Sequence, residues 1–322
     1  MGDRPVGHGS APLPADNRHR SSWDRFCRLV ERCMVDGVLL RTMMWAPWLA
    51  RWLRKPLARV VWIVAGSWRR SLLANAEVIL GPGSTRSQRS RLGRSVLANS
   101  QMFMIDLVRL RNFTVEQLEQ QVAAIHGRDR FVELLQSGRG AILVTAHIGS
   151  FETAIAVLTS YTKNIHVVYL HDYLGTFDRI RENVRRRLGV IDEPVDRGME
   201  TWLRLRDALD SGHVVLMQGD RVQEGQQGME TLFFGRKAMV PSGPLKLASM
   251  TGSCLVPVYC LRRADRKFEL FLEEPIDVPV GRIDDPATAP AQRALIESME
   301  KIIRKDPSQW LAVHKMWPEP NE

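Results

Sequence analysis

The sequence lacks a long uncharged hydrophobic run. Its most apolar stretch covers residues 43–66. Four basic side chains interrupt that stretch: Arg51, Arg54, Lys55 and Arg59. A membrane-spanning helix needs about 20 consecutive apolar residues, so we expect no transmembrane segment. Residues 1–22 also lack the apolar core of a signal peptide, and no secretory leader is expected.

Cysteine is scarce. The four cysteines, Cys27, Cys33, Cys254 and Cys260, show neither a Cys-x-x-Cys redox pair nor the spacing of a zinc site. A disulfide scaffold is therefore excluded, a reducing cytoplasm is expected, and no metal or cofactor is expected. Cys254 and Cys260 lie on one face of an expected strand and are interpreted as core residues.

Acidic residues are nearly missing from residues 51–100. This segment holds a single acid, Glu77, and ten basic side chains, so it carries the whole net charge of +9. The basic residues are Arg51, Arg54, Lys55, Arg59, Arg69, Arg70, Arg86, Arg89, Arg91 and Arg94. Such a segment favours an anionic partner: nucleic acid, an acidic carrier protein or an anionic membrane surface.

Tryptophan and leucine recur at helical spacing beside these charges. The apolar stripe is Trp45, Trp48, Leu49, Trp52 and Leu53, with Arg51, Arg54 and Lys55 opposite. This pattern predicts a helix in the headgroup plane of a membrane. Packing of the stripe on the protein's own core remains the alternative. Binding to nucleic acid is not expected, because no recognition motif accompanies the basic residues.

The chain divides into three regions by pattern. Residues 1–22 are rich in Gly, Pro and Ser and predict a disordered tail. Residues 23–137 predict helices with no clear strand, broken near Pro47, Pro56, residues 81–83 and residues 112–114. Residues 138–322 predict an α/β core.

Short β-branched runs alternate with helical stretches in that core. Strands are expected at 141–146, 165–170, 214–217, 255–261 and 268–272. Helices are expected from 150, at about 177–188 and 197–211, from 242, and at about 287–305. The fold class is therefore α/β: a mixed, partly parallel sheet flanked by helices, with an N-terminal helical region that associates with membranes.

The chemistry is expected where the first of these strands ends. His147 follows the buried run, Gly149 provides a turn, and Glu152 lies in the first turn of the next helix. Ligands of open α/β sheets bind at this edge. We expect the Glu152 carboxylate to fold back onto the imidazole, as a general base acting on a hydroxyl requires. Free N–H groups around Gly149 to Phe151 are expected to help stabilise an oxyanion.

Taken alone, His-x4-Glu is a weak signal, and a strand-end histidine with a capping glutamate is the alternative. The surrounding segment 138–152, however, resembles the lysophospholipid acyltransferase superfamily, in particular lipid A late acyltransferases. Further blocks of the same branch follow in order over roughly residues 60–318: Tyr169 with 179–189, 209–221, 233–248, 251–258, and Trp310 with His314 and Trp317. Ser150 and Phe151 stand where the branch often has Asn-Trp.

The resemblance implies roles for individual residues. His147 is the general base, and Glu152 is its orienting partner. Arg185, Arg187, Asp220 and Arg221 fall in blocks expected to hold substrate phosphates; a solvated helix face is the alternative for the arginines. A tight loop is expected to shape the substrate pocket, with an ordinary hairpin as the alternative. Its residues are Phe234, Gly235, Arg236, Pro241 and Gly243.

The resemblance implies a peripheral O-acyltransferase on the cytoplasmic face of the inner membrane. It would move a fatty acyl group from a thioester, on acyl carrier protein or coenzyme A, to a hydroxyl of a lipid A-like or related glycolipid. A glycerolipid or ornithine-type acceptor is an alternative, as is a non-catalytic membrane-bound scaffold. The sequence does not give the acyl chain length.

Overall fold

The computed structural model describes residues 43, 45–170, 175–195, 198–222, 226–283 and 286–317. The expected tail at 1–22 and both Cys27 and Cys33 lie outside these residues. The helices are α3 (Pro47–Val64), α4 (Gly66–Leu80), α5 (Arg86–Leu110), α6 (Val115–Glu119), α7 (Arg128–Gln136), α8 (Phe151–Leu158), α9 (Gly175–Arg187), α10 (Met199–Asp210), α11 (Gly243–Thr251) and α12 (Ala289–Lys305), with 3-10 turns η3 (Pro286–Thr288) and η4 (Pro307–Gln309).

A seven-stranded sheet with the order β1-β9-β8-β2-β5-β3-β4 forms the centre of the molecule. Its strands are β1 (Val122–His126), β2 (Ala141–Thr145), β3 (Ile165–Tyr169), β4 (Ile191–Pro194), β5 (Val214–Gln218), β8 (Cys254–Arg262) and β9 (Phe268–Leu272). Among these strands, β8 and β9 pair antiparallel and the other neighbours pair parallel. The expected α/β class and mixed, partly parallel sheet are confirmed, and the sheet is mostly parallel.

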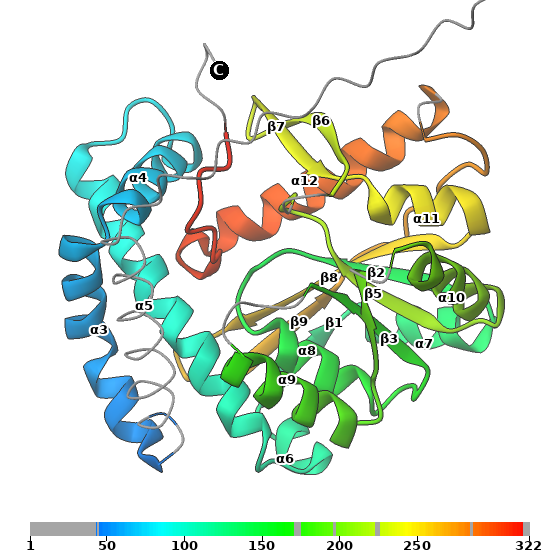
Figure 1. Cartoon of the computed structure of the whole chain (residues 1–322), viewed down its shortest axis with the longest axis horizontal. Helices are drawn as coiled ribbons and strands as arrows, with labels where there is room; N and C mark the ends of the chain where they lie inside the picture. Colours follow the sequence, from blue (N-terminus) through cyan, green and yellow to red (C-terminus); the bar gives the residue numbers. More distant parts are fainter. Residues whose placement is uncertain are drawn as a thin grey trace, which may run out of the picture.

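Helices cover both faces of the sheet (Figure 1). Strand β2 is buried throughout because it lies between β5 and β8. Its side chains alternate between the two layers, as the strand period of two requires. Ala141 and Leu143 face a cluster that includes residues of α5, α8 and α9. Ile142 and Val144 face a cluster that includes residues of α10, α11 and α12.

The region 23–137 is not free of strands, and that expectation is wrong. Strand β1 (Val122–His126) lies within it and pairs with β9 at the edge of the sheet. Strand β1 is only five residues long and is half-exposed, so its sequence contains no long apolar run. The expected helix breaks at 81–83 and 112–114 are confirmed, because α4, α5 and α6 are separated there.

The break expected at Pro56 is also wrong. Helix α3 begins at Pro47 and continues through Pro56 to Val64. Proline removes one backbone hydrogen bond from a helix and leaves the carbonyl four residues earlier without its partner. Trp52 and Pro56 both lie on the exposed side of α3, so water can reach this turn.

The tryptophans of the expected apolar stripe are exposed, whereas Leu49 is half-buried. Trp45, Trp48 and Trp52 are 86%, 71% and 74% exposed, while Ala50 and Ala58 are buried in clusters that include residues of α5. No described helix is both long enough and apolar enough to cross a bilayer. Cys254 and Cys260 belong to β8 and are buried in the core, as expected.

Candidate active site

The site forms where two neighbouring parallel strands end. His147 follows β2 by two residues, and Asp220 follows β5 by two residues. Because β2 and β5 are paired in register, their carboxyl ends meet at the same edge of the sheet. Gly219 permits this approach, since a Cβ atom there would clash with the side chains of Val144 and Met299.

Asp220 holds the His147 ring and backbone together. Its Oδ1 lies 2.8 Å from Nδ1 of His147, and its Oδ2 accepts a 3.0 Å hydrogen bond from the His147 backbone N–H. The indole N–H of Trp310 donates a further 2.8 Å hydrogen bond to Oδ2. This arrangement fixes the ring orientation and leaves Nε2 without a partner among the described residues.

Asp220 is an ionised carboxylate in this setting. Burial alone would raise its pKa, but the His147 charge, with hydrogen bonds from His147 and Trp310, lowers the pKa to about 2. The carboxylate is fully buried, whereas the His147 side chain remains 22% exposed. A buried, charged orienting group beside an accessible imidazole is the arrangement of a general base.

Glu152 does not contact the imidazole, and that expected pairing is corrected here. The Glu152 carboxylate accepts two hydrogen bonds from Arg185, of 3.1 Å from Nε and 2.5 Å from Nη2. Glu152 lies in the first turn of α8 and is directed toward α9, which packs on the same side of the sheet. The position of Glu152 on α8 therefore directs its carboxylate away from the His147 imidazole.

Arg185 is likewise committed to protein partners. Its Nη1 donates a 2.9 Å bond to Asp192, and its side chain is only 3% exposed. Burial would lower the Arg185 pKa, but Glu152 and Asp192 raise it above its ordinary value. Since the pair with Glu152 is buried and bidentate, the expected phosphate contact of Arg185 does not fit this structure.

Arg187 lies apart from the site. Its guanidinium donates to the backbone carbonyls of Leu110, Arg111 and Phe113, where α5 ends. A cation at the carboxyl end of a helix stabilises the free carbonyl groups there. The structure therefore gives Arg187 a helix-capping contact in place of the expected phosphate contact.

Arg221 follows Asp220 directly. No described side chain forms an ion pair with it, and its charge is one of the causes that lower the His314 pKa to about 4, after burial. His314 lies in the C-terminal segment, where its buried Nδ1 has no hydrogen-bond partner among the described groups. Arg221 thus remains a candidate substrate contact near His147.

The tight loop expected around Phe234 is the turn of a hairpin. Strands β6 (Gly228–Phe233) and β7 (Arg236–Pro241) pair antiparallel, with Phe234 and Gly235 between them at φ values of 52° and 72°. Arg236 is exposed, and Pro241 ends β7. The alternative kept open in the sequence analysis, an ordinary hairpin, is therefore the local structure.

The hairpin nevertheless contacts the site through aromatic rings. Phe233 packs edge-to-face on Trp310 at 5.8 Å and stacks on Trp317 at 5.8 Å. Trp317 also donates a 2.9 Å hydrogen bond to the Phe233 carbonyl. Gly243, at the start of α11, lies against Trp202 and Met217 and does not join this aromatic cluster.

The glycine after His147 is required by close packing. Gly149 has φ of 61°, and a Cβ atom there would clash with the Cys260 carbonyl oxygen. Its N–H donates to the Gln309 carbonyl at 2.9 Å, and the Ser150 N–H donates to the Cys260 carbonyl at 2.9 Å. These two N–H groups are therefore not free for an oxyanion, contrary to the sequence expectation.

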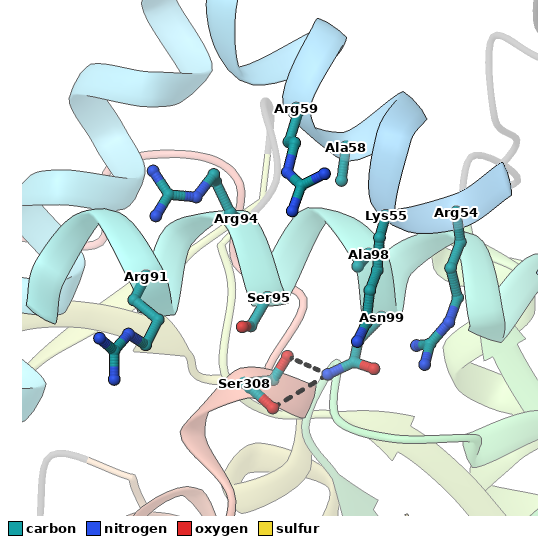
Figure 2. Close-up of a pocket in the computed structure, with 10 residues that line it drawn as sticks. All are labelled: Arg54, Lys55, Ala58, Arg59, Arg91, Arg94, Ser95, Ala98, Asn99 and Ser308. Carbon is teal, nitrogen blue, oxygen red and sulfur yellow. Dashed lines mark hydrogen bonds between the residues drawn. The ribbon is translucent and has the colours of Figure 1, made fainter. Parts of the chain in front are cut away.

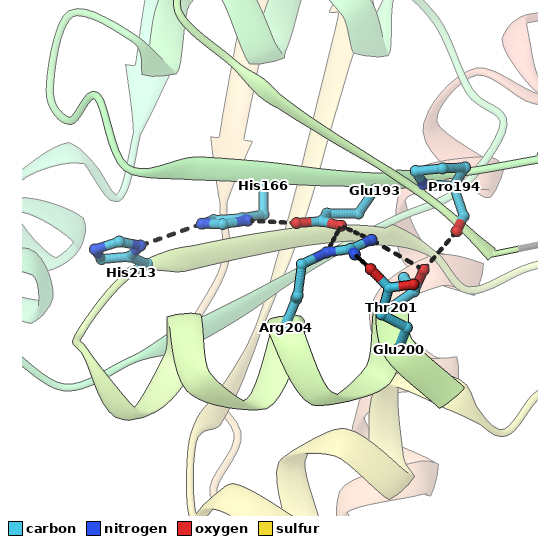
Figure 3. Close-up of polar contacts among 7 residues, drawn as sticks. All are labelled: His166, Glu193, Pro194, Glu200, Thr201, Arg204 and His213. Carbon is cyan, nitrogen blue, oxygen red and sulfur yellow. Dashed lines mark hydrogen bonds and ion pairs between the residues drawn. The ribbon is translucent and has the colours of Figure 1, made fainter. Parts of the chain in front are cut away.

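A second group of titratable side chains lies away from the candidate site (Figure 3). His166 contacts Glu193 and His213 at 3.1 Å each, and Arg204 donates a 3.0 Å hydrogen bond to Glu193. Burial lowers the His166 pKa, against the opposing effect of Glu193. Each group has a partner within the cluster, which joins β3, β4 and α10.

Sequence reasoning missed two contacts of the site. It placed Asp220 among the substrate contacts and gave Trp310 no role. The signal for Asp220 was present, because Gly219-Asp220 follows a buried strand just as His147 does. The Trp310 contact depends on the path of the chain after α12, which no periodicity predicts.

Comparisons with known proteins identify the family of the chain. The family described as bacterial lipid A biosynthesis acyltransferase matches residues 35–319. A phosphatidylinositol mannoside acyltransferase of Mycobacterium tuberculosis is 25% identical over 226 residues, which cover 66% of each chain, slightly less than two-thirds of that relative. A phosphatidylinositol mannoside acyltransferase of Mycolicibacterium smegmatis is 25% identical over 237 residues, which cover 70% of this chain and 71% of the relative. The chain belongs to the bacterial lipid A biosynthesis acyltransferase family.

Proposed function

We propose that this protein is an O-acyltransferase that moves a fatty acyl group from a thioester to a hydroxyl of a membrane glycolipid. The observation that carries the proposal is the His147 imidazole held at Nδ1 by the buried Asp220 carboxylate, with Nε2 left open. Family membership supports acyl transfer, and the names of the relatives support a glycolipid acceptor.

The reaction follows from this geometry. Nε2 of His147 takes the proton of the acceptor hydroxyl, and the resulting alkoxide oxygen attacks the thioester carbonyl carbon. The tetrahedral intermediate collapses with cleavage of the C–S bond, and the imidazolium returns its proton to the departing thiolate. General-base catalysis of this kind contributes about 10² to 10⁴ in rate. No covalent enzyme nucleophile is required.

Asp220 acts through His147. The neutral ring presents its Nδ1–H to Asp220, so Nε2 carries the free lone pair. When the ring becomes cationic, the ionised carboxylate stabilises it. Trp310 holds the second carboxylate oxygen in place and keeps it from turning away. This pairing replaces the His147–Glu152 pairing expected from the sequence.

Arg221 is proposed as the substrate cation of the site. It lies next to Asp220 in the chain, and no described residue pairs with it. A guanidinium there can hold a phosphate of the donor or acceptor. Arg185 and Arg187 are not proposed as substrate contacts, because both guanidinium groups are held by the protein contacts described above.

We also propose peripheral association with the cytoplasmic face of the inner membrane. The exposed tryptophans at Trp45, Trp48 and Trp52 support it, because indoles favour the boundary between headgroups and acyl chains. The acceptor would then reach the site from the bilayer in which it is dissolved.

The test is the product formed by purified protein. Acyl-coenzyme A and acyl-acyl carrier protein are supplied separately with a membrane lipid extract, and products are identified by mass spectrometry. A new ester on a glycolipid, formed by wild-type protein and missing with His147→Ala, supports the proposal. An acylated glycerolipid or ornithine lipid as the product would overturn the glycolipid acceptor, and no acylated lipid with either donor would overturn the reaction.

A further inference from the structure

A cavity of about 440 Å³ lies between α3 and α5 (Figure 2). Its volume falls within the range of small-molecule sites. Side chains of the two helices form its walls, and Ser308 of η4 closes one side. The lining residues are Arg54, Lys55, Ala58, Arg59, Arg91, Arg94, Ser95, Ala98, Asn99 and Ser308.

Five of these side chains are cationic and none is acidic. Three come from α3 and two from α5, so the two helices direct positive charge into one space. None of the five forms an ion pair with a described residue. By contrast, Arg89 of the same helix α5 is paired with Glu77 at 2.8 Å. The cavity therefore has an excess of positive charge that an anion would neutralise.

The side of the cavity near Ser308 carries neutral polar groups. Nδ2 of Asn99 donates hydrogen bonds of 2.8 Å to the Ser308 carbonyl and 3.0 Å to its hydroxyl. Ser95 lies nearby on the same helix (Figure 2). Hydroxyl, amide and guanidinium groups together are the usual ligands of a phosphate.

Positive charge also extends beyond the cavity. The Arg262 backbone N–H and carbonyl exchange two 2.9 Å hydrogen bonds with the side chain of Gln309, the residue after Ser308. Burial, followed by the charges of Arg54 and Arg51, lowers the Arg262 pKa to about 10. The Nε atoms of Arg51 and Arg262 are buried without a described hydrogen-bond partner. Arg262 is paired with Asp106, but Arg51 and Arg54 form no ion pair with a described residue, so cations outnumber their acidic partners in this part of the molecule.

The exposed tryptophans identify the source of the anion. Trp48 and Trp52 lie on α3 about two turns before Lys55 and Arg59, respectively, and both of these cations line the cavity. Indoles prefer the boundary between headgroups and acyl chains, and cations prefer the headgroup layer. A protein ligand such as an acidic carrier would account for the cations but not for these exposed apolar rings.

We propose that the cavity between α3 and α5 binds the phosphate of an anionic phospholipid headgroup while the tryptophans of α3 enter the same leaflet. The site is separate from His147 and goes beyond the proposed acyl transfer. It is, however, linked to the active site through one segment of chain. Ser308 borders the cavity, and three residues later the Leu311 N–H donates a 2.7 Å hydrogen bond to the His147 carbonyl.

The experiment measures binding of the full-length protein to vesicles, with no substrate present. Vesicles of phosphatidylcholine with and without 30% phosphatidylglycerol are compared by cosedimentation. The test variant is Arg59→Gln/Arg91→Gln, which removes one exposed cation from each helix. The matched control is Lys163→Gln/Arg293→Gln, which removes two exposed cations away from α3 and α5.

We expect the test variant to lose at least tenfold in affinity for phosphatidylglycerol vesicles and the control to lose less than twofold. Each cation near an anionic leaflet contributes about 1 kcal/mol, so loss of two supports a change of this size. Arg59→Lys/Arg91→Lys should bind within threefold of wild type, which shows that charge and not folding is responsible. Equal losses in test and control variants would show diffuse attraction and overturn the site.

Two competition arms distinguish other ligands. Inorganic phosphate that displaces the protein from vesicles at millimolar concentration, at constant ionic strength, would identify a free-phosphate site and overturn the headgroup assignment. A test variant that binds vesicles as wild type does, but loses affinity for acyl carrier protein, would also overturn it. Because no turnover is measured, these outcomes are independent of the role of His147.

Discussion

The indole N–H of Trp310 donates a 2.8 Å hydrogen bond to Asp220, the carboxylate that orients His147. Trp310 lies ninety residues beyond Asp220 and packs through Phe233 against the β6–β7 hairpin. The geometry of the proposed base therefore depends on three segments distant in sequence: the ends of β2 and β5, and the chain after α12.

His147→Ala should abolish acyl transfer with the fold retained. The substitution removes the proposed base from a strand end that is partly exposed, so little packing is lost. We expect a fall of at least 10² in kcat, measured by product formation, with an unchanged circular dichroism spectrum. His126→Ala is the matched control, since His126 is an exposed histidine paired with Glu269. Activity of His147→Ala within tenfold of wild type would refute the assignment.

Asp220→Asn should reduce kcat by about 10² to 10⁴ with little change in KM. An amide can hold the ring in the tautomer that has no free lone pair at Nε2, and it cannot stabilise the cationic ring. The carboxylate stabilises the cationic ring that forms once the proton has moved, so its loss should appear in kcat and leave KM nearly unchanged. An unchanged kcat would mean that Asp220 serves only to join β2 and β5.

Glu152→Gln tests the corrected pairing. The substitution leaves Arg185 buried beside a neutral amide, and breaking a buried ion pair costs about 3 kcal/mol or more. We expect this loss in urea unfolding, with the acid limb of the pH–rate profile unmoved. In Glu152→Leu/Arg185→Met, where both charges are gone, the loss should be smaller. A shifted limb with normal stability would instead support the contact of Glu152 with the imidazole that the sequence suggested.

Strong periodic elements of this fold are predictable from sequence. Residues 268–272 were expected as a strand and form β9 with the same bounds, because a short run of large apolar residues lies between polar turns. Strand β1 and the four-residue β4 were missed, since their half-exposed patterns contain no such run. Local sequence carries little information about edge strands, which gain their stability from neighbours distant in the chain.

The site was predictable only in part. His147 was identified by its position after a buried strand, and Asp220 occupies the equivalent position after β5. Which acid reaches the imidazole depends on the strand order, which places β5 beside β2. Glu152 is closer in sequence, but the direction of its side chain on α8 places it against Arg185. Spacing along the chain cannot distinguish these two carboxylates.

His314 should make stability fall in mild acid. Burial, followed by the charge of Arg221, lowers its pKa in the folded protein to about 4, against an ordinary value of 6.5. Between these values the unfolded chain binds a proton that the folded protein does not, so unfolding becomes easier as pH falls. We expect wild type to lose about 2 kcal/mol more than His314→Gln between pH 7 and pH 4.5, measured by urea unfolding. Parallel losses would show that His314 is not held neutral.

Replacing Trp45, Trp48 and Trp52 with serine should release the protein from vesicles. The three indoles are at least 71% exposed, so their removal should leave the α/β fold and its thermal unfolding unchanged. Affinity from buried indole area does not depend on lipid charge, so binding should weaken on neutral and anionic vesicles alike, whereas Arg59→Gln/Arg91→Gln should affect anionic vesicles alone.

The matched control for the tryptophan variant is serine at Met199, Leu232 and Met250, exposed apolar residues on other elements. This control should bind vesicles as wild type does, because the proposed contact surface is confined to the α3 region. If the tryptophan variant still cosediments with both kinds of vesicle, the stripe takes no part in membrane binding. The cations would then have to act without an apolar anchor, and high salt alone should release the protein.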